Sequence, residues 1–129
     1  MTASAFMSKA IQAAASARAL LDRSDTDGAC NRAYYAVFNA ACAALLAAGY
    51  EVGKTHSGVL NAFHQHLVRT GEISKDDGQL LKRIETFRYI ADYSENEVDW
   101  LDAEEMVLEA ERFVTTLQLV IERPEPTVK

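Results

Sequence analysis

The chain has 129 residues, of which 49% are hydrophobic, and it carries a formal net charge of −6. This length allows one domain with a buried core and is too short for two comfortable ones. No apolar run approaches the ~18 residues that a membrane-spanning helix needs, and the first residues lack the basic start and leucine-rich stretch of a secretory signal, so we expect a cytoplasmic protein that contacts no membrane.

The negative charge is concentrated in one region. Residues 1–91 contain ten Lys/Arg and eight Asp/Glu, whereas residues 92–111 contain nine acids and no base. Acids grouped in this way usually form a solvated helix face, and without compensating bases they repel a phosphate backbone. We therefore expect residues 92–111 to face solvent or a basic partner, and any RNA to follow the helices that carry Lys and Arg.

The composition predicts helices throughout the chain. Strand signals are nearly absent, and Ala, Leu and Glu dominate. The pattern predicts a first helix from about Ser4 to Asp22 and a second from about Asp27 to Ala48, ended by Gly49. The second helix is apolar almost all round, which indicates that it is the most buried element.

Three further helices complete the predicted fold. Thr55 is the expected N-cap of a third helix that reaches Arg69. The last two helices are predicted to begin at pairs that resemble a capping box, which are Ser74 with Asp77 and Asp102 with Glu105. The chain stops being helical before Pro124, so residues 124–129 form a short tail. Five helices with short connections predict an all-α, antiparallel up-and-down bundle, with a single domain over residues 1–123.

Neither the cysteines nor the histidines have the spacing of a metal site. Cys30 and Cys42 lie twelve residues apart on one predicted helix, roughly 18 Å, which is too far for a disulfide. We expect them to be buried, unreactive thiols. His64 and His66 point to different faces of a helix and are not a metal pair. The sequence thus predicts no metal and no cofactor.

Two sets of polar residues interrupt the apolar faces. The first set lies on one line of the second helix and consists of Arg32, Tyr35 and Asn39. The second is the stretch FRYIADY of the fourth helix, in which Arg88 and Asp92 are spaced i, i+4. These two residues can form an ordinary intrahelical ion pair of about 0.3–0.5 kcal/mol. Alternatively they belong to a site, in which case we expect them to point into a cleft that they share with Arg32 and Tyr35.

Three segments, taken in order, resemble the HEPN domain family, and more narrowly its small stand-alone prokaryotic members. The segments are NRAYYAVFNAACAALLAAG (31–49), KTHSGVLNAF (54–63) and RYIADY (88–93). The resemblance covers most of the chain, from about Ser16 to Arg123. It implies a helical bundle that usually dimerises, so we expect a homodimer with two-fold symmetry. It also implies a minimal nucleotidyltransferase as the partner in a two-gene toxin–antitoxin module.

The resemblance also implies a type of chemistry. Many HEPN domains are metal-independent ribonucleases that carry an arginine followed, after four to six residues, by a histidine. Arg88 matches the arginine, but Tyr, Ser and Glu occupy positions 93–95, where the histidine would stand. Cleavage without a metal needs a base, an acid and a cation beside the phosphate. The expected catalytic residues are Arg88, Asp92, Tyr93 and His56, and the expected RNA- or nucleotide-binding residues are Arg32, Tyr35, Asn39 and Lys54.

Two hypotheses stay open. The first is a ribonuclease-like toxin component of a two-gene module with a minimal nucleotidyltransferase. The second is a catalytically silent HEPN module that binds a nucleotide or RNA, or holds a nucleotidyltransferase partner. The missing histidine makes the second hypothesis a serious rival, and growth arrest on expression of this chain alone would favour the first.

Overall fold

A computed structural model describes residues 1–122 of the chain. In order, its elements are α1 (Ala3–Asp22), α2 (Thr26–Ala47), α3 (His56–Phe63), the π-helical segment η1 (His64–Val68), α4 (Lys75–Tyr93) and α5 (Trp100–Glu122). The predicted all-α bundle is thereby confirmed. No helix in the described part is long and apolar enough to cross a membrane. The predicted tail over residues 124–129 lies outside the described residues.

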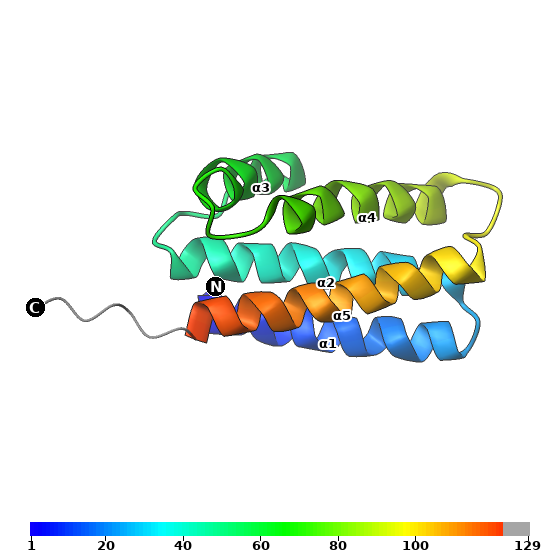
Figure 1. The fold of residues 1–129 in the computed structure, drawn as a ribbon. Coiled ribbons are helices and arrows are strands. Elements are labelled where there is room, and N and C mark those ends of the chain that lie inside the picture. Colours follow the sequence, from blue (N-terminus) through cyan, green and yellow to red (C-terminus); the bar gives the residue numbers. More distant parts are fainter. Residues whose placement is uncertain (123–129) are drawn as a thin grey trace, which may run out of the picture.

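Helix α2 lies at the centre of the bundle (Figure 1). Helices α1 and α5 pack on one side of it, and α3 and α4 on the other. Tyr34, Val37 and Leu45 of α2 are 0% exposed, as expected for a helix with apolar residues all round. The other helices of the bundle cover the apolar residues of α2. The apolar character of α2 therefore gives no reason to invoke a second copy of the chain.

Local signals set most helix boundaries. Four helices begin with a side-chain oxygen that accepts a hydrogen bond from the backbone N–H three residues later, and these caps are Thr2, Asp25, Thr55 and Ser74. Gly49 and Gly71 follow α2 and η1 with φ of 93° and 89°. This left-handed conformation favours glycine, so the expected end of the second helix at Gly49 is confirmed, and Gly71 ends η1 in the same way.

The predicted third helix reaching Arg69 is confirmed as a continuous helical segment, but it changes type at His64, which was not expected. After α3 the chain widens into η1, where the backbone N–H of Arg69 donates to the carbonyl of His64 at 2.9 Å, the i→i+5 pattern of a π-turn. In this turn the imidazole of His64 packs against Gly78 of α4, where an added Cβ would lie 3.0 Å from His64 Cε1. The change from α-helix to π-helix thus occurs where the chain packs closely against α4. The helix propensities of the residues do not predict this change.

The last helix also begins earlier than predicted, at Trp100, so Asp102 and Glu105 do not form its cap. The backbone N–H of Val98 donates to Asp27 Oδ1 at 3.0 Å, and the Val98 side chain is 5% exposed. The connection before α5 is thus anchored to the first turn of α2. A contact between residues far apart in the sequence decides the helix start, and a local cap pattern cannot report it.

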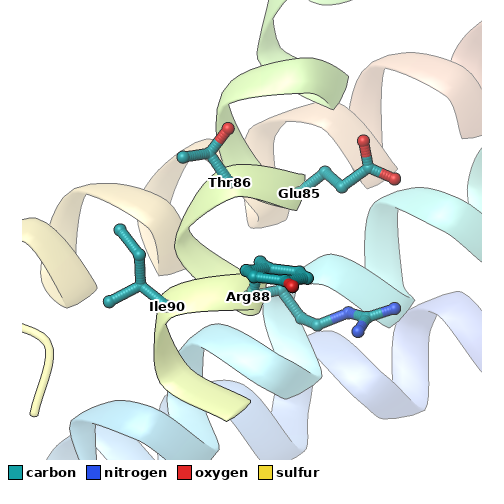
Figure 2. A pocket seen from close by; sticks show the side chains of 5 residues that line it. Glu85, Thr86, Arg88 and Ile90 are labelled. Atoms are coloured by element: carbon teal, nitrogen blue, oxygen red, sulfur yellow. The ribbon is translucent and has the colours of Figure 1, made fainter. Parts of the chain in front are cut away.

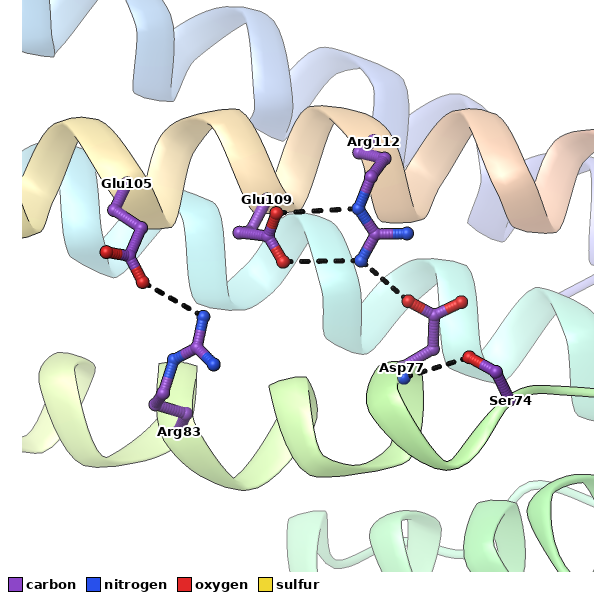
Figure 3. A network of polar contacts seen from close by, with 6 residues as sticks. All are labelled: Ser74, Asp77, Arg83, Glu105, Glu109 and Arg112. Carbon is purple, nitrogen blue, oxygen red and sulfur yellow. Dashed lines mark hydrogen bonds and ion pairs between the residues drawn. The ribbon is translucent and has the colours of Figure 1, made fainter.

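The acids of residues 92–111 have more compensation than the sequence indicated. Arginines from three helices reach them, in the pairs Arg18–Glu111 at 2.7 Å, Arg83–Glu105 at 3.1 Å and Arg112–Glu109 at 3.3 Å. Arg112 also binds Asp77 of α4 at 2.7 Å, and Figure 3 shows these contacts between α4 and α5. Arginines from elsewhere in the chain thus balance part of the acidic stretch, namely Asp92, Glu105, Glu109 and Glu111, whereas the other five acids have no ion pair within residues 1–122.

Candidate functional site

Arg88 lies on the flank of α4 that faces α2. Its side chain is 17% exposed, and its guanidinium carbon lies 4.7 Å from the centroid of the Tyr34 ring and 5.9 Å from that of Tyr35. A guanidinium over an aromatic face is stabilised by about 0.5–2 kcal/mol. Within the described residues, Arg88 Nε is buried and has no hydrogen-bond partner. The side chain is therefore packed in place, while part of its donor capacity remains unused.

A chain of polar contacts joins Arg88 to the start of α2. Arg88 Nη1 donates to Asp92 Oδ2 at 3.4 Å, and Asn31 Nδ2 donates to the two Asp92 oxygens at 3.2 and 3.3 Å. Asn31 Oδ1 in turn accepts from Arg32 Nε and Nη2 at 3.1 and 2.9 Å. The guanidinium carbon of Arg32 lies 4.9 Å from the centroid of Tyr35. Asp92 and Asn31 thus connect two arginines that each stack on a tyrosine.

Tyr34 connects Arg88 to His56, the first residue of α3. Tyr34 is 0% exposed, and its hydroxyl lies 3.1 Å from His56 Nδ1. Burial, assisted by the Glu85 carboxylate and opposed by Arg88, raises the pKa of Tyr34 to about 12, so the phenol keeps its proton near neutral pH. The half-buried His56 ring also packs on Phe38, with centroids 4.3 Å apart. The imidazole is held from two sides.

The structure brings most of the predicted site residues together. We use the name Arg88 cluster for Asn31, Arg32, Tyr34, Tyr35, His56, Arg88 and Asp92. Tyr93 lies beside the cluster with 68% exposure, and its ring contacts Tyr89 at a centroid distance of 4.7 Å. In residues 1–122, neither Asn39 nor Lys54 has a hydrogen bond or ion pair with the cluster. Lys54 is exposed just before α3.

Sequence reasoning missed Asn31 and Tyr34 of the cluster, and also Phe38, which packs on His56. Because they are spaced i, i+3 and i+7, these residues lie along one side of α2, next to the side that carries Arg32, Tyr35 and Asn39. A signal was available, because the amide of Asn31 and the hydroxyl of Tyr34 need partners on a helix that is otherwise buried. Nothing in the spacing indicated that His56 would supply one of those partners.

A shallow hollow borders Arg88 on the outer side of α4. It has a volume of about 360 Å³ and is lined by Glu85, Thr86, Arg88, Tyr89 and Ile90. Figure 2 shows Glu85 and Arg88 extending from one side of the helix, and Thr86 and Ile90 from the other. Because a single helix supplies the entire lining, this hollow does not enclose a ligand as binding clefts usually do.

The potential metal ligands and thiols lie apart from one another. In the described part of the chain, no group of three or more His, Cys, Asp or Glu residues is arranged to hold a metal ion. Cys30 and Cys42 are buried, as expected. Burial is the main cause that raises the pKa of Cys30 to about 12 and that of Cys42 to about 11. Both thiols therefore stay protonated and poorly nucleophilic near neutral pH.

Comparison with known proteins assigns the chain to a family. The HEPN domain matches residues 3–120. A UPF0332 protein of Thermotoga maritima is 36% identical over 107 residues, covering 82% of this chain and 80% of that protein. A UPF0332 protein of Gloeobacter violaceus is 33% identical over 110 residues, or 84% and 86% of the two chains. A Methanocaldococcus jannaschii protein named "Putative toxin" is 34% identical over 87 residues, or 67% and 64%. The resemblance seen in the sequence motifs is thus confirmed, and the chain belongs to the HEPN domain family.

Proposed function

We propose that this HEPN protein is the ribonuclease-like toxin component of a two-gene module with a minimal nucleotidyltransferase. Family membership and the name of the Methanocaldococcus relative support a toxin-like role. One observation carries the proposed chemistry: Arg88 and His56 come from different helices and contact the same tyrosine, Tyr34. A cation and a proton carrier are therefore close together, although the histidine that the family motif places on α4 is missing.

Cleavage of RNA without a metal requires two proton transfers at one phosphate. The 2′-oxygen loses its proton as it bonds to phosphorus, and the 5′-oxygen gains a proton as its bond to phosphorus breaks. Arg88 would stabilise the charge on the phosphorane oxygens with the N–H groups that Asp92 leaves free. His56 would accept the 2′-proton on Nε2, since its Nδ1 contacts Tyr34, and water would supply the proton that the departing 5′-oxygen gains.

The other cluster residues fit supporting roles. Asp92 already accepts hydrogen bonds from Asn31 and Arg88, which suits it to orient Arg88 better than to act as a base. Arg32 at the far end of the chain of contacts would attract the RNA backbone. Lys54 is exposed and stands shortly before His56 in the sequence. Together with Arg32 it would form a basic path for the RNA along α2 and α3, away from the acids of α5.

We also propose that the protein is a homodimer that covers the outer face of α4. Tyr89, Ile90 and Tyr93 are 63%, 37% and 68% exposed on that helix, and the hollow beside Arg88 lacks an opposite wall. A second copy would supply this wall and bury the apolar rings. Sedimentation should show a dimer at tens of micromolar, and Tyr89→Glu should dissociate it. A wild-type monomer at that concentration would contradict the proposal.

A second candidate function is a catalytically silent module that binds RNA or a nucleotide, or holds a nucleotidyltransferase. The exposed pair Tyr89–Tyr93 favours it, because neighbouring aromatic rings beside a guanidinium can stack bases and bind phosphate without any proton transfer. Under this alternative the protein would bind RNA and leave it intact.

Cleavage of labelled RNA in the presence of EDTA tests the first proposal. Arg88→Lys keeps the charge and loses the bidentate fork, and His56→Asn removes the proton carrier. The matched controls are Arg83→Lys, which changes an arginine of α4 that pairs with Glu105, and His66→Asn in η1. We expect both cluster variants to lose cleavage by about 100-fold or more and both controls to retain it.

The remaining outcomes separate the two candidates. Binding of RNA by the wild type without cleavage would support the silent module. Neither binding nor cleavage would refute the ribonuclease and the RNA-binding form of the silent module. The toxin assignment has its own test, which is growth on expression of the chain alone. Growth arrest that is relieved by a nucleotidyltransferase encoded beside this gene would support the two-gene module, and normal growth would count against a toxin.

A further inference from the structure

We propose that the start of α5 is a docking surface for a basic segment of a partner protein, which places an arginine or lysine side chain in a hollow between α4 and α5. The inference is independent of the proposed ribonuclease function, because its residues do not belong to the Arg88 cluster. The hollow, which we call the acidic hollow, has a volume of about 180 Å³. It is lined by Phe87, Ile90, Glu97, Val98, Asp99 and Asp102.

The acids of this hollow have no cation to balance them. Within residues 1–122, none of Glu97, Asp99 and Asp102 forms an ion pair, and they belong to no group of side chains arranged to hold a metal ion. Carboxylates close together repel one another, and a positively charged side chain of a partner would relieve this repulsion. RNA would be repelled from the same place.

The size and the walls of the hollow match a long basic side chain. Pockets for drug-sized ligands measure about 300–1,000 Å³, so the acidic hollow suits a single side chain better than a small molecule. Phe87, Ile90 and Val98 supply apolar walls beside the carboxylates. Lysine and arginine pack their methylene stems on apolar surface and keep the charged end in a polar place. The hollow offers both surroundings to one side chain.

Two large apolar side chains stand next to the hollow in the sequence. Trp100 and Leu101, between Asp99 and Asp102, are 43% and 74% exposed. They begin α5 at the end of the bundle where the chain returns from α4 (Figure 1). Exposed apolar residues with charged neighbours mark protein interaction sites, and tryptophan is frequent among the residues that dominate binding. A second copy of the chain is a poorer match than a basic partner, because each copy carries a net charge of −6.

Trp100 is the only tryptophan of the chain, so its fluorescence reports directly on this surface. The probe is a synthetic helical peptide of about twelve residues, with arginine and leucine on one face and no aromatic residue. The control peptide has glutamate in place of arginine. We expect the arginine peptide to shift the Trp100 emission to shorter wavelength in a saturable way, because docking removes water from the indole. The glutamate peptide should cause no shift.

Charge variants of the protein locate the binding. Asp99→Asn/Asp102→Asn should weaken binding of the arginine peptide by about tenfold or more, because the acidic hollow loses two carboxylates. The matched control Glu51→Gln/Glu72→Gln removes two exposed acids elsewhere and should bind within about twofold of the wild type. Leu101→Ser tests the apolar part of the surface and should also weaken binding. Circular dichroism confirms that each variant is folded.

Three results would overturn the inference. The first is the absence of a saturable emission shift with the arginine peptide. The second is equal weakening in the two double variants, since the peptide would then respond only to the net charge of the protein. The third is a wild-type dimer that Leu101→Ser dissociates in sedimentation, because a second copy would then cover this surface.

Discussion

Replacing Arg112 with alanine should destabilise the protein far more than replacing Arg83 with alanine. Both arginines join α4 to α5 through carboxylates (Figure 3), with Nη2 to oxygen distances of 2.7 Å for Asp77 and 3.1 Å for Glu105. They differ in the burial of the acid. The Asp77 side chain is 6% exposed, and that of Glu105 is 60% exposed. The two substitutions thus compare a buried carboxylate with a solvated one across the same helix pair.

The expected magnitudes follow from that difference. Removing one partner of a buried ion pair costs about 3–5 kcal/mol, because a charge is left buried without compensation. Arg112 is itself 46% exposed and water can reach the site after its removal, so we expect about 2–3 kcal/mol. A solvent-exposed pair contributes only about 0.2–1 kcal/mol, so Arg83→Ala should cost less than about 1 kcal/mol.

Urea unfolding measures both values, as a shift of the midpoint at constant m. The double variant Asp77→Asn/Arg112→Ala provides a further check. It removes the unpaired charge, so it should be more stable than Arg112→Ala alone. Equal losses for Arg112→Ala and Arg83→Ala would refute the reasoning, since burial of Asp77 would then have no energetic consequence.

Three further predictions concern other parts of the molecule. Arg88→Ala should lower the free energy of unfolding by about 1–2 kcal/mol, because stacking on two tyrosines is lost, and unchanged stability in urea would show that this packing is unimportant. In the unfolded chain the thiols of Cys30 and Cys42 ionise near the ordinary cysteine pKa of 9.0, while the folded ones stay protonated until the pH reaches about 12 and about 11. The unfolded state then binds fewer protons, so stability should fall as the pH rises from about 9 to 11; a Cys30→Ala/Cys42→Ala variant with the same pH dependence would contradict this origin. Finally, crosslinked RNA should map to α2, α3 and α4, and crosslinks concentrated at residues 104–111 would overturn the proposed basic path.

Much of the fold was predictable because helix boundaries depend on neighbours in the sequence. The caps Thr55 and Ser74 and the left-handed Gly49 act within one turn of the chain. The start of α5 was not predictable in this way, because Val98 is held by Asp27 in another helix. The π-turn at His64 lies against Gly78 of α4, and no local pattern announces that contact.

The sequence by itself determined that Arg88 and Asp92 share one side of a helix, since four residues complete about one turn. Only the tertiary structure decided which side of α2 meets them. Tyr34 and Tyr35 are consecutive residues of α2, so their side chains leave the helix in directions that differ by a rotation of about 100°. That rotation is set by the packing of the whole core. It brings Tyr34 and the distant His56 to Arg88, and it leaves Asn39 outside the cluster.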